Sequence, residues 1–127
     1  MVVCGALVLG AVAGLAAPPL SGFGFRTPSG NIVCNRGLAT TGAPGVSCVV
    51  FSASSATRGQ ASWLVGPSGR ARFRFVLGNI GTDVPVLPYG RSWRRYGIVC
   101  TSRSTSLTCR NRDGHGFTLS RERRQIF

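Results

Sequence analysis

The sequence predicts a mainly β fold, a small antiparallel β domain of short strands and hairpins. Three observations predict it. Eighteen glycines and seven prolines in 127 residues break the chain into short runs and mark many turns. Good helix formers are scarce, whereas Gly, Ser, Thr and Val are common, so long helices are not expected. Several of the runs alternate apolar and polar residues, as half-buried strands do. The length suits one domain with a modest core.

The N-terminus has the pattern of an export segment. No charged side chain occurs before Arg26, and residues 2–17 are apolar and mostly small. This is typical of a secretory signal peptide, although no basic residue precedes the run. We therefore expect residues 1–17 to be a signal peptide and residues 23–127 to form a single domain that is secreted, periplasmic or held in the cell envelope. An uncleaved anchor is the alternative, but the run is shorter than the ~20 residues that a spanning helix needs.

Four cysteines remain outside that segment: Cys34, Cys48, Cys100 and Cys109. An even number in a small exported domain indicates two disulfides, for which three connectivities exist. Local pattern favours one of them. A two-residue turn at 104–105 would place Cys100 opposite Cys109 on antiparallel strands, within disulfide range, and leave Cys34 to pair with Cys48. The cysteines lack the close spacing of zinc ligands, so we expect no metal site and no cofactor.

The first half of the chain predicts strands on both sides of clear turns. Residues 23–27 alternate, 28–30 (Pro-Ser-Gly) form a turn, and strands resume at 31–35 and 46–51. Further along, residues 66–69 (Gly-Pro-Ser-Gly) predict a hairpin turn between strands at 62–65 and 70–77. In the second of these strands, arginines at 70, 72 and 74 alternate with Ala71, Phe73 and Phe75, which predicts an arginine face and a core face.

The second half continues the pattern. Residues 84–87 contain a proline, so a strand there would lie at a sheet edge. A hairpin is expected over 98–110, followed by a turn at Asp113-Gly114 and a strand at 117–119. The polar segment 120–126 is compatible with a short closing helix.

Three blocks of sequence stand out: Phe25-x-Thr27-Pro28-Ser29-Gly30-Asn31-Ile32-x-Cys34, Leu87-Pro88-Tyr89-Gly90, and Cys109-Arg110-Asn111-x-Asp113-Gly114-His115-Gly116-Phe117-x-Leu119-Ser120-Arg121. With these blocks the chain resembles a secreted bacterial family known as domain of unknown function 6636. Unlike many such proteins, it has no further cysteine pair in its centre, and it has Ser106 where a glycine is common. The resemblance implies export and a small disulfide-bonded fold. It implies no activity.

The charge balance is strongly positive. Fifteen arginines and no lysine stand against three acidic residues, for a net charge of +12. Such a field attracts anions, nucleic acid or anionic membrane surfaces. Arginine also binds phosphate and carboxylate in bidentate fashion. Alternatively, the absence of lysine reflects a codon-biased genome that writes arginine for every surface cation.

One candidate binding site is a cluster in which three arginines are interleaved with aromatic residues: Tyr89, Arg91, Trp93, Arg94, Arg95 and Tyr96. Arginines beside aromatic rings can hold phosphates and stack on bases or sugars. The alternative is a hairpin edge whose aromatic residues belong to the core. Nothing in the sequence singles out nucleic acid as the partner.

The candidates for catalysis are few. His115, the only histidine, lies between two glycines and could act as a general acid or base, or could be a turn residue bonded to a carbonyl. A catalytic triad would need it beside a serine and Asp83 or Asp113, but no nucleophile-elbow sequence is present. A nuclease-like enzyme would pair it with Glu122. Seven residues of strand would separate the two by ~23 Å and point them to opposite faces.

The sequence therefore favours a non-enzymatic binding module for an anionic partner at or outside the cell envelope. A small secreted, nuclease-like hydrolase that acts through His115 is the first alternative. A structural envelope protein without a ligand is the second.

Overall fold

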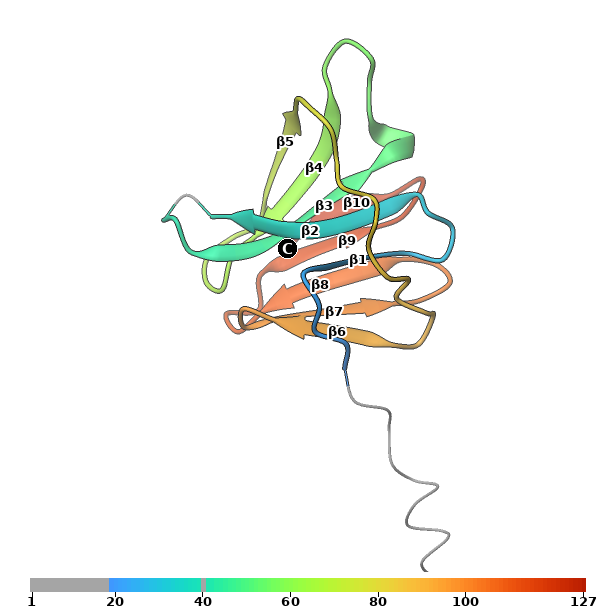
Figure 1. Cartoon of the computed structure of the whole chain (residues 1–127). Coiled ribbons are helices and arrows are strands. Elements are labelled where there is room, and N and C mark those ends of the chain that lie inside the picture. Colours follow the sequence, from blue (N-terminus) through green and yellow to red (C-terminus); the bar gives the residue numbers. More distant parts are fainter. Residues whose placement is uncertain (1–18, 40) are drawn as a thin grey trace, which may run out of the picture.

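Two five-stranded antiparallel sheets pack face to face in the computed structural model of the chain (Figure 1). The structure describes residues 19–39 and 41–127. The expected signal peptide, residues 1–17, lies outside the described residues. Within the described ranges, no helix has the length and apolar character needed to cross a membrane. The mainly β prediction is confirmed.

The first sheet is a meander in which each strand pairs with the next one along the chain. Its strands are β1 (Gly24–Arg26), β2 (Ile32–Leu38), β3 (Pro44–Val50), β4 (Gln60–Val65) and β5 (Arg72–Val76), with a short 3-10 turn η1 (Phe51–Ala53) after β3. The turn predicted at 66–69 joins β4 to β5, as expected. Because every connection is a short turn or loop, each pair has the antiparallel register that hairpins impose.

The second sheet is built in the same way, with the order β10-β9-β8-β7-β6. Its strands are β6 (Ser92–Arg95), β7 (Ile98–Ser102), β8 (Leu107–Asn111), β9 (Gly116–Leu119) and β10 (Arg124–Ile126). The closing helix expected over 120–126 is wrong. Ser120 donates its backbone N–H to the Arg123 carbonyl at 2.8 Å in a tight turn, and β10 then pairs with β9. This pairing satisfies backbone groups of β9 that a helix would leave at an open edge.

A long connection, residues 77–91, links the two sheets and crosses the outer face of the first (Figure 1). Asn35 donates its side-chain N–H to the Gly81 carbonyl at 3.0 Å, and the Arg26 guanidinium donates to the Thr82 carbonyl at 3.3 Å. The edge strand expected at 84–87 reduces to one parallel bridge between Arg26 and Val86. The crossing segment therefore covers one side of β1 and part of β2.

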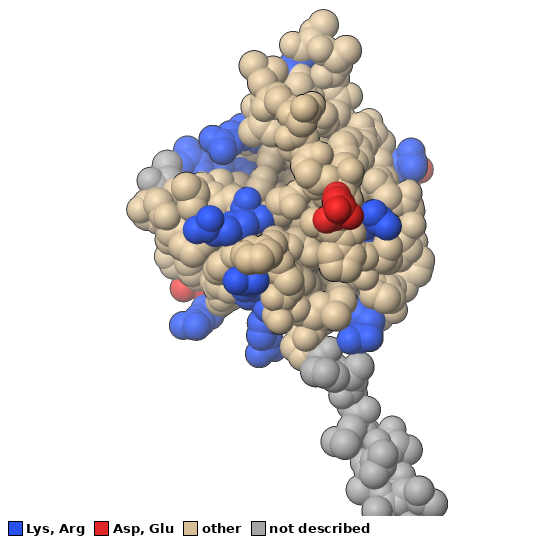
Figure 2. Space-filling view, viewed as in Figure 1, with Lys and Arg blue, Asp and Glu red and all other residues tan. Residues whose placement is uncertain are grey.

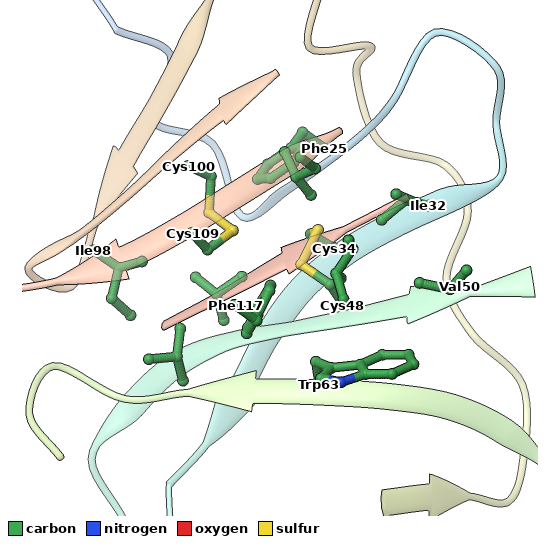
Figure 3. Close-up of a cluster of buried hydrophobic side chains, with 14 of the residues drawn as sticks. Phe25, Ile32, Cys34, Cys48, Val50, Trp63, Ile98, Cys100, Cys109 and Phe117 are labelled. Carbon is green, nitrogen blue, oxygen red and sulfur yellow. A yellow bond between two sulfur atoms is a disulfide. The ribbon is translucent and has the colours of Figure 1, made fainter. Parts of the chain in front are cut away.

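Both disulfides lie in the centre of the core, on facing inner surfaces of the two sheets (Figure 3). Cys34 bonds to Cys48 across β2 and β3, and Cys100 bonds to Cys109 across β7 and β8. In both pairs the Cα atoms are 4.0 Å apart, and none of the four residues is exposed. The predicted connectivity and the two-residue turn at 104–105 are confirmed.

Aromatic side chains surround the disulfides and fill the space between the sheets. The ring of Phe25 from β1 lies 5.4 Å from that of Trp93 from β6, which joins the first sheet to the second. Phe117 from β9 and Trp63 from β4 are also buried in this cluster (Figure 3). Rings in such tilted arrangements contribute beyond the area that they bury.

The alternation predicted for β5 is confirmed in part. Arg72 and Arg74 are exposed, and Ala71 is buried. Phe73, however, keeps 43% of its surface exposed although it faces the same side as Trp63, its partner in the ladder. The reason is its position on the outermost strand, at the margin of the core.

We expect that removing either disulfide destabilises the fold without rearranging it. Replacing Cys34 and Cys48 together by alanine should lower the free energy of unfolding by about 3 kcal/mol on chain-entropy grounds, and the Cys100–Cys109 pair should give a slightly smaller loss. Chemical denaturation measures both. The control replaces Ser92 and Thr101 by alanine. Their hydroxyls also face each other across two paired strands, β6 and β7, at 3.1 Å, but no covalent bond is lost.

Mass spectrometry of unreduced peptides from the native compartment should find the same two bonds. Crossed pairing, or four free thiols, would contradict this structure.

Candidate ligand-binding pocket

The predicted arginine and aromatic cluster does not form one surface. Trp93 is only 2% exposed, and its indole N–H donates to the Gly22 carbonyl at 3.0 Å. It is therefore a core residue, with its polar atom satisfied by the backbone. Arg94, its neighbour on β6, points to the opposite face of the strand and is exposed. In this conformation Trp93 cannot touch a ligand.

Arg95 already has partners within the protein. Its guanidinium lies 4.7 Å from the ring centre of Phe23 and 5.1 Å from that of Tyr96, and it donates to the Ser21 carbonyl at 3.2 Å. These contacts hold the residues before β1 against the end of β6. Arg91 is half-buried just before β6. The remaining member, Tyr89, lies toward the other end of β6.

The turn that carries His115, between β8 and β9, is held by hydrogen bonds to the side chain of Asn111. Asn111 is 4% exposed and donates both amide N–H groups, to the Gly66 carbonyl at 3.1 Å and to the Gly69 carbonyl at 2.8 Å. Its oxygen accepts the backbone N–H groups of Asp113 at 3.0 Å and His115 at 3.1 Å. A single side chain thus ties the β8–β9 turn to the β4–β5 turn, and so one sheet to the other.

Neighbouring residues complete this tether. An oxygen of the Asp113 carboxylate accepts the Gly69 N–H at 2.8 Å. Gly114 has a φ of 81°, which favours glycine. Gly116 has no room for a Cβ, because the Cys109 carbonyl occupies that position. The glycines on both sides of His115 are therefore explained by the backbone.

The structure does not bring the proposed catalytic residues together. His115 lies immediately before β9 and Glu122 lies beyond its other end, at opposite ends of the sandwich. Asp113 is engaged with Gly69, and Asp83 lies in the crossing segment. The described residues contain no cluster of three His, Cys, Asp or Glu side chains that could hold a metal ion.

The feature that sequence reasoning missed is a pocket of about 320 Å³ at one end of the sandwich. Four segments meet there: the turn before β2, Tyr89, the β7–β8 turn, and the β9–β10 turn. The lining residues are Thr27, Ser29, Asn31, Ile32, Tyr89, Arg103, Ser104, Thr105, Ser106, Leu107, Leu119, Ser120, Arg121 and Glu122. Each of the three blocks that carry the family resemblance contributes to this lining, and that coincidence is the signal by which it could have been found.

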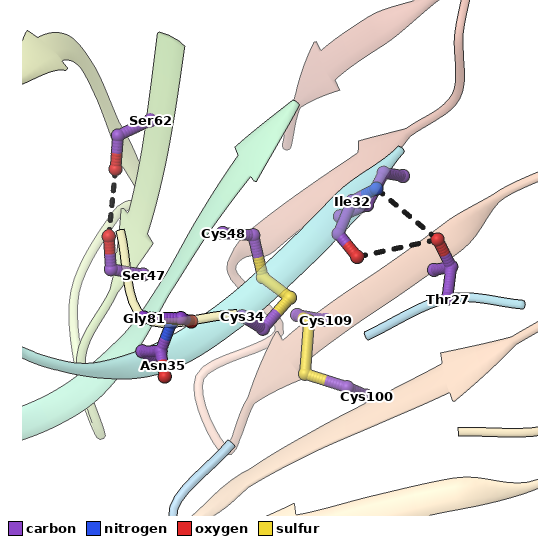
Figure 4. Close-up of a disulfide and its surroundings, with 10 residues drawn as sticks. All are labelled: Thr27, Ile32, Cys34, Asn35, Ser47, Cys48, Ser62, Gly81, Cys100 and Cys109. Atoms are coloured by element: carbon purple, nitrogen blue, oxygen red, sulfur yellow. Dashed lines mark hydrogen bonds between the residues drawn. A yellow bond between two sulfur atoms is a disulfide. The ribbon is translucent and has the colours of Figure 1, made fainter. Parts of the chain in front are cut away.

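Hydrogen bonds between side chains and the backbone fix the walls of this pocket. The N–H of Ile32 donates to the Thr27 hydroxyl at 3.3 Å, and that hydroxyl reaches the Ile32 carbonyl at 3.4 Å (Figure 4). Asn31 forms two bonds with Ser52, at 3.0 and 2.9 Å. The turn before β2 is thereby held to the end of β3.

The other walls are held in the same way. The Gly90 N–H donates to the Ser102 carbonyl at 2.7 Å, which places Tyr89 beside the β7–β8 turn. The Ser120 hydroxyl closes the β9–β10 turn through bonds of 3.0 and 2.9 Å to Arg123. The pocket is therefore largely preformed, as binding sites usually are.

Several side chains of the lining have no bonding partner within the described part of the chain. They are Tyr89, Arg103, Ser104, Thr105, Ser106, Arg121 and Glu122. Their groups include two guanidinium donors, four hydroxyls and one carboxylate. The walls are thus fixed while the groups that face the opening stay available.

Comparison with known proteins agrees with the resemblance seen in the sequence. Residues 75–127 match a family model described as "Family of unknown function (DUF6636)". The chain is similar to DUF6636 from β5 to its end, which includes Tyr89 and both of the turns that carry Arg103 and Arg121. The turn before β2 lies outside the matched range. No curated protein and no solved structure matches the chain.

We expect Asn111→Ala to be among the most destabilising single substitutions outside the disulfides. It removes four hydrogen bonds, of which the one to the Gly66 carbonyl is buried and the other three are partly buried, for a loss of about 2–4 kcal/mol in the free energy of unfolding. Asn35→Ala is the control, since it removes one exposed bond, to Gly81. Urea denaturation of both variants measures the difference. Similar losses would show that the tether does not hold the sheets together.

Proposed function

We propose that the protein is a non-enzymatic binding module for an anionic ligand, and that the end pocket is its site. The observation that carries this proposal is the position of Arg103 and Arg121. They come from two different turns, line the same pocket, and have no hydrogen-bond, ion-pair or ring partner among the described residues. A guanidinium has five N–H donors in a planar fork that matches the oxygens of a carboxylate or phosphate.

Several other arginines are engaged within the protein, and Arg103 and Arg121 are distinguished by lining the same pocket. Guanidinium groups of Arg26, Arg95 and Arg124 donate to backbone carbonyls. Those of Arg58 and Arg110 lie over the rings of Phe75 and Phe127, at 5.9 and 5.1 Å. Such cations contribute to the field of the protein, but their donors are partly used.

The rest of the lining suits an oxygen-rich ligand. Hydroxyls of Ser104, Thr105 and Ser106 can donate to or accept from sugar or phosphate oxygens. Tyr89, which is 51% exposed, offers an aromatic face at the rim. The volume lies at the lower end of the range for small-molecule sites, so we propose that it takes a single anionic group of a larger polar ligand.

The net charge of +12 has a different role from the pocket. On the face of the molecule seen in Figure 2, arginines are scattered and separated by uncharged surface. A scattered field attracts anions over a distance but does not orient them. We propose that the field raises the local concentration of the ligand, and that Arg103 and Arg121 bind it.

The core supports a proposal about the compartment. Two buried disulfides indicate an oxidising, extracytoplasmic environment. Together with the signal-like residues 1–17, they support a secreted protein or one held in the envelope, with its partner there. The hydrolase alternative finds less support, because His115 lies at the end of the sandwich opposite the pocket and its turn is explained by backbone bonds.

The first test is charge removal in the pocket. Replacing Arg103 and Arg121 together by glutamine should weaken binding of polyphosphate and of a polyuronate at least tenfold and flatten the salt dependence, because fewer counterions are released. The control pair is Arg36→Gln with Arg70→Gln, which removes equal charge from exposed positions outside the lining. Fluorescence titration over a range of salt concentrations measures the affinities. Equal losses in both pairs would mean that only the general charge matters.

The second test separates a module from an enzyme. His115→Ala should leave polyanion affinity nearly unchanged, because the residue lies far from the pocket and adds little to the field of fifteen arginines. If His115 were a general acid or base, the substitution would reduce turnover by roughly 10²–10⁴-fold. RNA, DNA and glycan polymers are the substrates to assay, with thermal unfolding measured in parallel. Wild-type turnover that disappears in a well-folded variant would refute the proposal.

A further inference from the structure

The two sheets have four edge strands, and two of these, β1 and β6, are covered by other segments of the chain. At β1, Arg26 donates its N–H to the Pro85 carbonyl at 2.9 Å and accepts from the Leu87 N–H at 2.8 Å. At β6, the Leu20 N–H donates to the Ser92 carbonyl at 2.9 Å, and the Leu20 carbonyl accepts from Arg94 at 2.7 Å. These two edges are covered by segments of the same chain.

The other two edges differ in length. β10 has three residues, and such short edges offer little to a partner strand. β5 has five, and in the described part of the chain no backbone hydrogen bond reaches its outer side. It is the longest uncovered edge there. Its unpaired N–H and C=O groups are a template for another strand.

The side chains around β5 add a place for a partner residue. A pocket of about 300 Å³ adjoins the strand and is lined by Leu38, Ala39, Leu64, Arg72, Phe73 and Arg74. The exposed ring of Phe73 is held 4.6 Å from that of Trp63 and 5.2 Å from that of Phe75. Strand addition of this kind takes affinity from the main chain and specificity from pockets for alternate side chains.

The positive charge of the arginines at β5 indicates which kind of strand can bind there. Arg72 and Arg74 lie on β5, with Arg70 just before it. A second copy paired through the same strand would place arginines against arginines, and like charges in opposed positions destabilise a ladder. The same arginines favour carboxylates. We propose that β5 docks an extended segment of another protein, in which acidic and apolar residues alternate, as an additional strand of the first sheet.

A synthetic peptide of alternating glutamate and valine is the probe, with a lysine and valine peptide as its counterpart. We expect the acidic peptide to bind and to slow deuterium exchange of the amides of residues 72–76, but not those of 124–126. Methylating alternate backbone nitrogens of the peptide should abolish binding, because it removes the donors of the new ladder.

Charge reversal gives the sharper test. Arg74→Glu should weaken binding of the acidic peptide at least tenfold and create binding of the lysine peptide. Arg36→Glu, the same change at an exposed position on β2, should do neither. The Arg103→Gln and Arg121→Gln pair should leave peptide binding intact, so the failure of the end pocket and the failure of this site are distinguishable.

Three results would overturn the proposal. Equal affinity for the lysine peptide would show that charge does not select the partner. Protection outside β5 would place the site elsewhere. A dimer in sedimentation experiments, formed without peptide and lost with Arg74→Glu, would make a second copy the occupant.

Discussion

The register of the central strand pairs is the constraint on which the rest of the domain depends, and covalent bonds fix it. Because side chains alternate between the two faces of a strand, a slip of one residue would move every inner side chain to the outside. The Cys34–Cys48 and Cys100–Cys109 bonds exclude such a slip in both sheets. Phe25, Trp63 and Phe117 then face the same interior. The β7–β8 turn, and Arg103 with it, takes its place as a consequence.

The two ends of the sandwich differ in how their polar side chains are bonded. At one end the Asn111 side chain uses all its bonding capacity on backbone groups, and the turns there are locked. At the other end the turns are also held by hydrogen bonds, but side chains such as Arg103 and Arg121 have no partner among residues 19–39 and 41–127. A rigid wall with unused polar groups binds a ligand at a lower entropic cost than a mobile one. The locked end supports the open end, because both belong to the same strands.

Local sequence pattern predicted the fold class, the disulfides and the turns at 66–69 and 104–105, since each depends on residues close together in the chain. The closing helix was wrong because β10 is decided by the free edge of β9, which no local pattern reports. The sequence left open whether Trp93 belongs to a binding cluster or to the core, because its burial depends on the opposite sheet. The end pocket could not be predicted from spacing, because its walls come from segments more than 90 residues apart, from Thr27 to Glu122.

The crossing segment also has a consequence for the order of folding. The outer edge of β1 is covered only when Arg26 has bonded to residues 85–87. Leu20 likewise forms its backbone bonds only with β6. Contacts between segments so distant in sequence form more slowly than hairpins. Each disulfide, by contrast, joins the two strands of one hairpin and can form as soon as those two strands have paired. We therefore expect both disulfides to form before residues 85–87 cover the outer edge of β1 and Leu20 bonds to β6.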